Sequence, residues 1–359
     1  MITKSYLEVN LKIRFYMKKL VQFRLLILTA LTASMVASCQ NQTNNRQTST
    51  SNQANCRIIE HELGKTEVCG QPQKIVVLSS NILEPLIALG IQPVAFGGHL
   101  AYYQEDFDNP EEQIPYLGSL ITQPIPNVGL AYEPSIEDIA KVQPDLIIGS
   151  QNNAQQYETL SQIAPTILLD WFEAETNLRA IAQAVNRTQQ AEQLLAETEQ
   201  RIANAREVFA PIVANNPNIL FLSSSQLKQI NFLDSSTPCT SLPEQLGFQP
   251  VSIPGLEAST PNSPLTPISI EKLPELNNAD SVIVLGHNFD ELEKPDNFNR
   301  NQISNVQQAW SKNAIAQSLD ASKAERVYFI PAYLCLGLPG AIGTKLYLEE
   351  LEEQLSPPG

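Results

Sequence analysis

The sequence is poor in basic residues: 23 Lys and Arg stand against 38 Asp and Glu, which gives a formal net charge of −15. Residues 1–38 hold six of the basic residues and one acid, so the remainder carries 17 basic and 37 acidic side chains. Binding to nucleic acid requires a basic face that neutralises phosphates. This balance excludes nucleic acid as a partner and favours either simple solubility or a basic protein partner.

The motifs of common catalytic sites are also absent. The sequence has no G-x-S-x-G nucleophile elbow and no H-E-x-x-H zinc pair, and GLPGAIGTK (337–345) lacks the G-K-[ST] order of a phosphate loop. It has only three His, of which His99 and His287 each follow a predicted strand. Two imidazoles without a third ligand do not make a transition-metal site. We therefore expect neither enzyme activity nor a directly bound metal ion.

The N-terminus has the pattern of a secretion signal. From Met17 it reads MKKLVQFRLLILTALTASMVASC, with a basic start, an apolar run and small residues before the Cys. The apolar run is shorter than the ~20 residues that a membrane-spanning helix needs. Val36 to Cys39 matches the bacterial lipobox, so 1–38 is predicted as a lipoprotein signal peptide and Cys39 as the lipidated residue. Because Met17 begins a complete signal, residues 1–16 are interpreted as an over-extended start.

This signal predicts an extracytoplasmic or periplasmic protein that a lipid holds at the membrane. Residues 39–55 have almost no apolar side chains and are predicted to form a disordered tether.

Four cysteines remain besides the lipidation site. An even number outside the cytoplasm favours disulfides, for which three connectivities are open. We favour pairing of Cys56 with Cys69, which flank a short loop, and of Cys239 with Cys335. No C-x-x-C spacing supports the alternative, a four-cysteine metal site.

Short apolar strands alternate with helices along the rest of the chain. The short connections between them favour a parallel sheet that helices cover on both faces. The predicted strands are 74–79, 93–96, 145–149, 166–170, 218–223, 281–285 and 326–331, and the predicted helices are 81–89, 157–163, 240–246, 310–317 and 346–355. The Pro-rich stretch 254–267 is predicted to be a loop.

Residues 174–210 contain no Gly or Pro, and apolar residues recur there at helical spacing. We expect a short helix, a break at Asn186–Thr188, and a helix of about 20 residues that spans about 30 Å and could cross between two lobes. The predicted division of the chain is an N-terminal lobe at 56–175, an interlobe helix at 176–211 and a C-terminal lobe at 212–359.

One segment of the sequence occurs twice. SIEDIAKVQPDLIIG begins at Ser135, and a variant with one inserted residue, SIEKLPELNNADSVIVL, begins at Ser269. The positions in register are Ser135/Ser269, Ile136/Ile270, Glu137/Glu271, Asp145/Asp280 and Ile148/Ile283. The separation exceeds the roughly 20–50 residues of a solenoid repeat, so it favours two similar lobes that each present one glutamate. The alternative is chance convergence of two ordinary αβ units.

Ligands of open α/β sheets bind outside the carboxyl ends of the strands. The residues that follow the predicted strands are rich in aromatic and hydroxyl groups, with Lys228 as the one obvious cation. Packing in the core is the alternative role for any single aromatic residue among them. The candidate ligand-binding residues are Ser80, Asn81, His99, Tyr102, Tyr103, Asn152, Trp171, Ser224, Lys228, His287 and Tyr333.

From Cys56 to Leu355 the chain resembles the periplasmic binding proteins for iron-siderophore and cobalamin uptake. The segments that carry the resemblance are KIVVLS, LEPLIALGIQPVAFG, VGLAYEPSIEDIAKVQPDLIIGS, LSQIAPTILLDW, ISIEKLPELNNADSVIV and AERVYFIP. The resemblance implies an α/β fold of two Rossmann-like lobes, each a mainly parallel sheet flanked by helices. In that family a long interlobe helix joins the lobes, which clamp a ligand with little hinge motion (the class III periplasmic-binding-protein fold).

The resemblance also implies a function. It makes the chain the substrate-binding lipoprotein of an ABC importer, which captures a ferric siderophore, needs no cofactor, and delivers it to a permease dimer with its ATPase. Glu137 and Glu271 match the two glutamates that dock into permease arginines, although an acid in the first turn of a helix is also favoured by the helix dipole.

The nature of the ligand stays open at this point. The absence of an obvious arginine cluster speaks against a polyanionic ferric citrate and favours a neutral hydroxamate complex, with cobalamin and haem as alternatives. Two further classes are a lipoprotein enzyme or metal-cluster protein on the same two-lobe scaffold, and an envelope interaction protein with an empty cleft.

Overall fold

The computed structural model describes residues 55–98, 105–234, 237–252, 265–288 and 298–356. The predicted signal peptide, Cys39, most of the predicted tether, and the candidates His99, Tyr102 and Tyr103 lie outside these ranges. Over the part of the chain that is described, no helix has the length and apolar character to cross a membrane.

The described chain begins with a β-hairpin. β1 (Cys56–His61) pairs antiparallel with β2 (Gly64–Cys69), and Cys56 lies directly opposite Cys69 in the register. A disulfide with an S–S distance of 2.04 Å joins these two residues. The sequence predicted only a short loop here, because a hairpin of mixed polar residues has no strong apolar alternation to reveal its strands.

The first lobe is built on a six-stranded sheet with the order β6-β5-β4-β3-β7-β8. Its strands are parallel except β6, which pairs antiparallel with β5. Apolar clusters lie on both faces of this sheet: α2 and α6 cover one face, and α4 and α5 cover the other. The elements are β3 (Ile75–Leu78), α2 (Ser80–Ala88), β4 (Ala95–Gly98), α3 (Pro110–Gln113), η1 (Gly118–Leu120), β5 (Asn127–Leu130), β6 (Glu133–Pro134), α4 (Ile136–Val142), β7 (Leu146–Ser150), η2 (Gln151–Gln156), α5 (Tyr157–Ser161), β8 (Thr166–Leu169) and α6 (Ala174–Ala184).

The second lobe has a sheet with the order β12-β10-β9-β13-β14, and β11 also pairs with β9. Strands β9, β13 and β14 are parallel, as are β3, β7 and β8 of the first sheet. Helices α8 and α12 cover one face, while α9, α10 and η3 cover the other. The elements are β9 (Asn218–Ser224), β10 (Ile230–Leu233), α8 (Pro238–Gln245), β11 (Gln249–Pro250), β12 (Leu265–Ile268), η3 (Ile270–Leu276), β13 (Ser281–Gly286), α9 (Phe298–Lys312), α10 (Ala314–Ser318), α11 (Asp320–Lys323), β14 (Val327–Pro331), η5 (Tyr333–Gly337) and α12 (Ala341–Leu355).

Two sequence predictions for the second lobe were wrong. The predicted loop at 254–267 ends in β12, which pairs antiparallel with β10; Pro267 is tolerated because β12 is an edge strand. The helix predicted to begin at residue 310 begins at Phe298. Its buried face includes a polar residue, Gln302, which interrupts the apolar spacing that a sequence pattern relies on.

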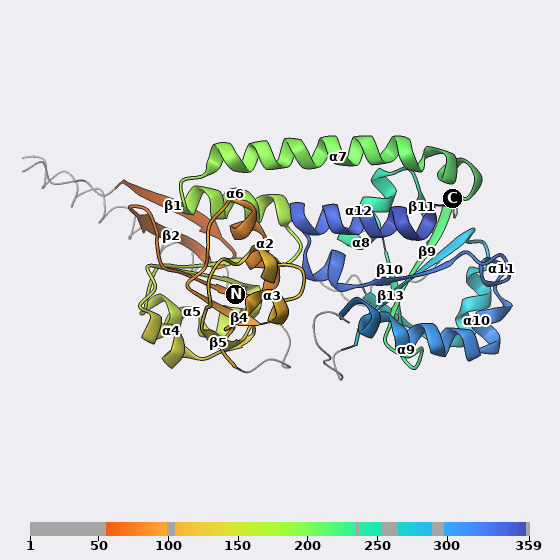
Figure 1. Cartoon of the computed structure of the whole chain (residues 1–359), viewed down its shortest axis with the longest axis horizontal. Coiled ribbons are helices and arrows are strands. Elements are labelled where there is room, and N and C mark those ends of the chain that lie inside the picture. Colours follow the sequence, from red (N-terminus) through yellow and green to blue (C-terminus); the bar gives the residue numbers. More distant parts are fainter. Residues whose placement is uncertain (1–54, 99–104, 235–236, 253–264, 289–297, 357–359) are drawn as a thin grey trace, which may run out of the picture. The chain divides into compact units, whose positions relative to one another are not determined.

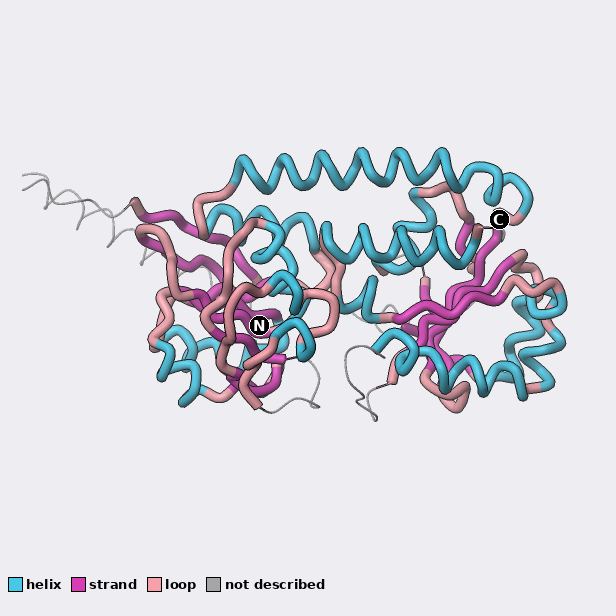
Figure 2. Tube along the Cα trace, viewed as in Figure 1, coloured by secondary structure: helices cyan, strands magenta, loops and turns pink. Residues whose placement is uncertain are grey.

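One long helix, α7 (Thr188–Asn215), packs against both lobes (Figures 1 and 2). It has 28 residues and therefore a length of about 42 Å. Near its start Ala191 belongs to the apolar core of the first lobe, and near its end Phe209 belongs to that of the second. The predicted break before α7 is confirmed, whereas the helix continues through Pro211, beyond its predicted end. The two-lobe α/β fold with a long connecting helix is thus the observed architecture.

Candidate ligand-binding cleft

A cavity of about 560 Å³ opens between the two lobes. In the first lobe it is lined by the connection from β4 to β5, and in the second by the start of α9, which follows β13. Both connections leave the carboxyl ends of parallel strands, where α/β sheets bind their ligands. The described residues that line the cavity are Glu111, Glu112, Ile114, Pro115, Tyr116, Ser119, Phe298 and Asn299.

Three aromatic side chains from separate parts of the chain pack together here: Tyr116 and Phe298 line the cavity, and Tyr333 packs against both of them without lining it. The rings of Tyr116 and Tyr333 are stacked at 5.7 Å between centroids, with 24° between their planes. Phe298 stands edge-on to both, at 5.7 Å from Tyr116 and 5.4 Å from Tyr333. We refer to Tyr116, Phe298 and Tyr333 as the aromatic trio. Aromatic faces of this kind suit a bulky, partly apolar ligand.

Tyr116 is held in an unusual conformation. Its φ of 61° lies in the left-handed region, which a bulky residue adopts only when its surroundings enforce it. Its hydroxyl donates a hydrogen bond to Asn299 Oδ1 of α9 in the other lobe. Burial, with the nearby Tyr333 and Glu350, raises the pKa of Tyr116, so the hydroxyl stays protonated at neutral pH.

Two predicted ligand residues, Tyr333 and Trp171, lie where the lobes meet. Tyr333 follows β14 after Ala332, and burial raises its pKa to about 12. Trp171 follows β8, and its Nε1 donates to the carbonyl oxygen of Leu336 in the second lobe at 2.8 Å. Both residues therefore follow a strand end and contact the opposite lobe.

Ser80 and Asn81 stand at the start of α2, directly after the carboxyl end of β3. Both are buried in this junction between strand and helix. Asn81 Oδ1 accepts a hydrogen bond from Ser79, but its Nδ2 has no partner within the described residues. Asn81 also lines a second cavity of about 490 Å³ between α2, α6, α7, α8 and α12.

The other predicted ligand residues that the structure describes are spread over both lobes. Ser224 is fully buried, and its hydroxyl is bonded to Gln229 O and Leu227 N, which stabilises the turn after β9. His287 Nδ1 lies 3.3 Å from Ser223 Oγ, and burial lowers its pKa, which favours the neutral ring. Asn152 and Lys228 are exposed, and neither lines one of the two cavities.

The repeated segments occupy equivalent places in the two lobes. Asp145 accepts hydrogen bonds from Gln73 N and Lys74 N just before β3, at 2.8 and 2.9 Å. Asp280 accepts one from Asn218 N at the start of β9, at 2.9 Å. The same acid therefore connects each repeat to the first parallel strand of its own sheet.

The two glutamates of the repeat are both exposed in the first turn of a helix. Glu137 forms an ion pair with Lys141 at 3.0 Å, and such an exposed pair contributes little to stability. The pKa of the Glu271 carboxyl is lowered by its own backbone N–H and by the Ser269 side chain. Each carboxylate is therefore presented to solvent and available to a partner.

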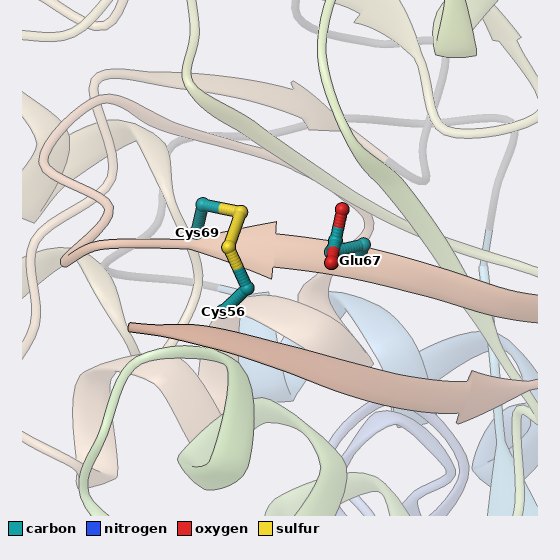
Figure 3. A group of neighbouring side chains, drawn as sticks. All are labelled: Cys56, Glu67 and Cys69. Carbon is teal, nitrogen blue, oxygen red and sulfur yellow. A yellow bond between two sulfur atoms is a disulfide. The ribbon is translucent and has the colours of Figure 1, made fainter. Parts of the chain in front are cut away.

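One group of side chains has the spacing of a metal site, but its chemistry speaks against one. Cys56, Cys69 and Glu67 lie close together on the hairpin (Figure 3). Their sulfur atoms are joined in the disulfide, whereas cysteine binds metals as the thiolate. The second disulfide joins Cys239 and Cys335, with an S–S distance of 2.10 Å, and connects α8 to η5.

Tyr116, Phe298 and Asn299 were not among the residues predicted from the sequence. They lie in connections far from the nearest strand end in sequence, and only the folded chain brings them beside Tyr333. The sequence feature that could have indicated Tyr116 and Phe298 as site residues was their position in connections between the strand-forming segments of each lobe.

Comparison with known proteins identifies the family. A model of the periplasmic binding protein family matches residues 75–334 of this chain. The match spans both sheets and α7, so the chain belongs to the periplasmic binding protein family.

Individual relatives agree with this assignment. The Fe(3+)-citrate-binding protein YfmC of Bacillus subtilis is 28% identical over 322 residues, which is 88% of this chain and 90% of YfmC. "Probable siderophore-binding lipoprotein YfiY", also of Bacillus subtilis, is 29% identical over 226 residues, 61% of this chain and 65% of YfiY. The crystal structure of Staphylococcus aureus SirA complexed with staphyloferrin B superposes with a TM-score of 0.66 at 21% identity, covering 83% of this chain and 98% of SirA. This superposition supports the fold.

Proposed function

We propose that this chain is the substrate-binding lipoprotein of an ABC importer and captures a ferric siderophore in the cleft between its lobes. The observation that carries the proposal is the aromatic trio beside a cavity of about 560 Å³. It lies at the strand ends where α/β sheets bind ligands. The names of YfmC, which binds Fe(3+)-citrate, and YfiY, a siderophore-binding lipoprotein, point to the same class of ligand.

The charge of the cavity favours one kind of ferric complex. Glu111 and Glu112 line it, and none of the described lining residues is Lys or Arg. A polyanionic complex such as ferric citrate would be repelled there, since like charges raise the free energy of binding. A neutral ferric hydroxamate avoids this repulsion and presents apolar surface to the aromatic trio. Among the predicted ligand residues that the structure describes, none lines this cavity, and Tyr333 is the one that packs against two lining residues, Tyr116 and Phe298.

We also propose that Glu137 and Glu271 are the docking residues for the permease dimer. Their support is the equivalent placement of the two repeats and the exposure of both carboxylates. Pairing of an exposed acid with arginine is short-range and oriented, which suits a docking contact that must form and break.

The proposal includes the lipid anchor at Cys39, the tether that follows it, and the extracytoplasmic location. The sequence pattern and the lipoprotein name of YfiY support these points. It also holds that the chain is not an enzyme and carries no cofactor, as is expected in a family of binding proteins.

Tryptophan fluorescence tests the capture of a ferric siderophore. Trp310 is buried in the second lobe, so Trp310→Phe leaves Trp171 as the single reporter at the junction of the lobes. We expect ferrioxamine B, a ferric trihydroxamate, to quench it saturably, and iron-loaded citrate to do so far more weakly.

A variant of the aromatic trio tests whether the quenching reports binding in the cleft. We expect Tyr116→Ala to weaken binding of ferrioxamine B by about tenfold, the effect of about 1.4 kcal/mol of lost contact. Tyr157→Ala is the matched control, because Tyr157 packs on His61 at the hairpin, outside the cavity. Equal weakening by both variants would show that the cleft is not the site. No signal with ferric siderophores, cobalamin or haem would refute the proposed function.

A further inference from the structure

Helix α12 begins without a cap of its own. Its N-cap is Gly340, which has no side chain, and its first turn contains no acidic residue. The first N–H groups of a helix have no partner within the helix and need acceptors from elsewhere. The start of α12 is also buried at Gly343, so water cannot serve as a free substitute.

The missing acceptor comes from the other lobe. Glu84 of α2 is completely buried, and its Oε2 accepts from Gly340 N at 2.8 Å. Its Oε1 accepts from Gly343 N, also at 2.8 Å. A carboxylate of the first lobe therefore caps a helix of the second lobe, 256 residues further along the chain.

The glycines of α12 permit this close approach. A Cβ at Gly340 would lie 3.0 Å from the Glu84 carboxylate. A Cβ at Gly343 would lie 1.7 Å from the carbonyl oxygen of Leu338, which no side chain could accept. The local sequence thus provides no cap of its own but leaves room for one from outside.

The segment just before α12 carries Tyr333 of the aromatic trio. Tyr333 begins η5, and its carbonyl oxygen accepts from Leu338 N at 3.1 Å, two residues before Gly340. The same segment is held at Leu336 by Trp171 of the first lobe. Besides the stacking of Tyr116 on Tyr333, two hydrogen-bonding residues of the first lobe therefore hold this segment, Trp171 at Leu336 within η5 and Glu84 at Gly340 just after it.

We propose that Glu84 is a positioning residue of the cleft, which couples the two lobes so that Tyr333 stands against Tyr116. The inference rests on the proposed function for its effect on ligand binding, whereas the coupling of the lobes does not depend on it. A carboxylate with no ion-pair partner among the described residues is costly to bury, so it needs the bonds to α12. Because Glu84 belongs to the first lobe and α12 to the second, these hydrogen bonds hold the two lobes together.

A double variant can distinguish the positioning of the lobes by Glu84 from simple stabilisation of α12. Glu84→Ala removes the carboxylate and leaves the first N–H groups of α12 without an acceptor. Adding Gly340→Ser supplies a local cap, because Gly340 has the extended backbone of an N-cap and the clash with Glu84 is gone. The double variant therefore restores the helix start without restoring the contact that Glu84 makes between the lobes.

Two measurements distinguish the variants. The distance between spin labels at exposed Glu158 and Gln308, one in each lobe, reports the coupling without any ligand. Titration with ferrioxamine B reports the cleft. We expect Glu84→Ala to lower Tm, to broaden the distance distribution, and to weaken binding by about tenfold through lost preorganisation. The double variant should recover most of the Tm while the distribution stays broad and binding stays weak.

Recovery of a narrow distribution in the double variant would overturn the proposal and leave Glu84 as a helix cap alone. Glu352→Ala, an exposed acid on the same helix, is the control and should match the wild type in both measurements. If Glu84→Ala does not fold, Glu84→Gln takes its place, since one amide oxygen can accept only part of the hydrogen bonds. If the wild type binds no ferric complex, the proposed function fails, and the distance measurement still decides the role of Glu84.

Discussion

Removal of the Cys239–Cys335 disulfide should destabilise the protein more than removal of Cys56–Cys69. The first closes a loop with a sequence separation of 96 and the second one of only 13. The entropy that a cross-link removes from the unfolded chain grows with the logarithm of the loop length. Loss of the Cys239–Cys335 disulfide should therefore lower the free energy of unfolding by about 5 kcal/mol, and loss of Cys56–Cys69 by about 3 kcal/mol. The Cys239–Cys335 disulfide also joins α8 to η5, which carries Tyr333. Its loss therefore acts on the cleft as well as on stability.

Urea unfolding of the two double Cys→Ala variants measures this difference. We expect both midpoints to fall relative to the wild type, with the larger fall for Cys239→Ala/Cys335→Ala. The wild type after reduction and alkylation of all four cysteines is the reference for the loss of both disulfides. A larger loss from the hairpin disulfide, or equal losses, would refute the reasoning from loop length.

The remaining predictions concern acidic residues. Burial raises the pKa of Glu84 to about 7 from its ordinary 4.5, so the folded chain binds this proton more tightly than the unfolded chain. The free energy of unfolding that this group contributes is fully present below about pH 4.5 and is lost as the pH rises through about 7. Above that pH the loss, measured relative to Glu84→Gln, reaches about 3 kcal/mol. Urea unfolding of both proteins at several pH values measures this difference. An opposite slope would contradict it. The double variant Glu137→Lys/Glu271→Lys should abolish uptake of the ferric siderophore and leave its affinity for the protein unchanged. Uptake at the wild-type rate would refute the docking role.

Much of the fold could be predicted from the sequence because local patterns of apolar residues determine it. The buried parallel strands, such as β3 and β13, are unbroken apolar runs, and the break before α7 coincides with Asn186, which has a positive φ. The edge of the second sheet was missed, since β10 and β12 are defined by pairing across an intervening helix rather than by their own composition.

The candidate site was only partly predictable for a similar reason. Tyr333 follows a strand end, so topology alone brings it to the junction of the lobes, next to the cleft. Tyr116 and Phe298 reach the same place through connections whose path depends on packing between the lobes. The buried contact of Glu84 with α12 has no sequence signature, because its partners are backbone N–H groups.

Capture of a ferric siderophore in the cleft can be measured by isothermal titration of the purified protein with ferrioxamine B and with its iron-free form. We expect saturable one-to-one binding of the ferric complex, clear weakening by Tyr116→Ala, and much weaker binding of the iron-free form. Absence of saturable binding to ferrioxamine B and to every other ferric siderophore tried would contradict it.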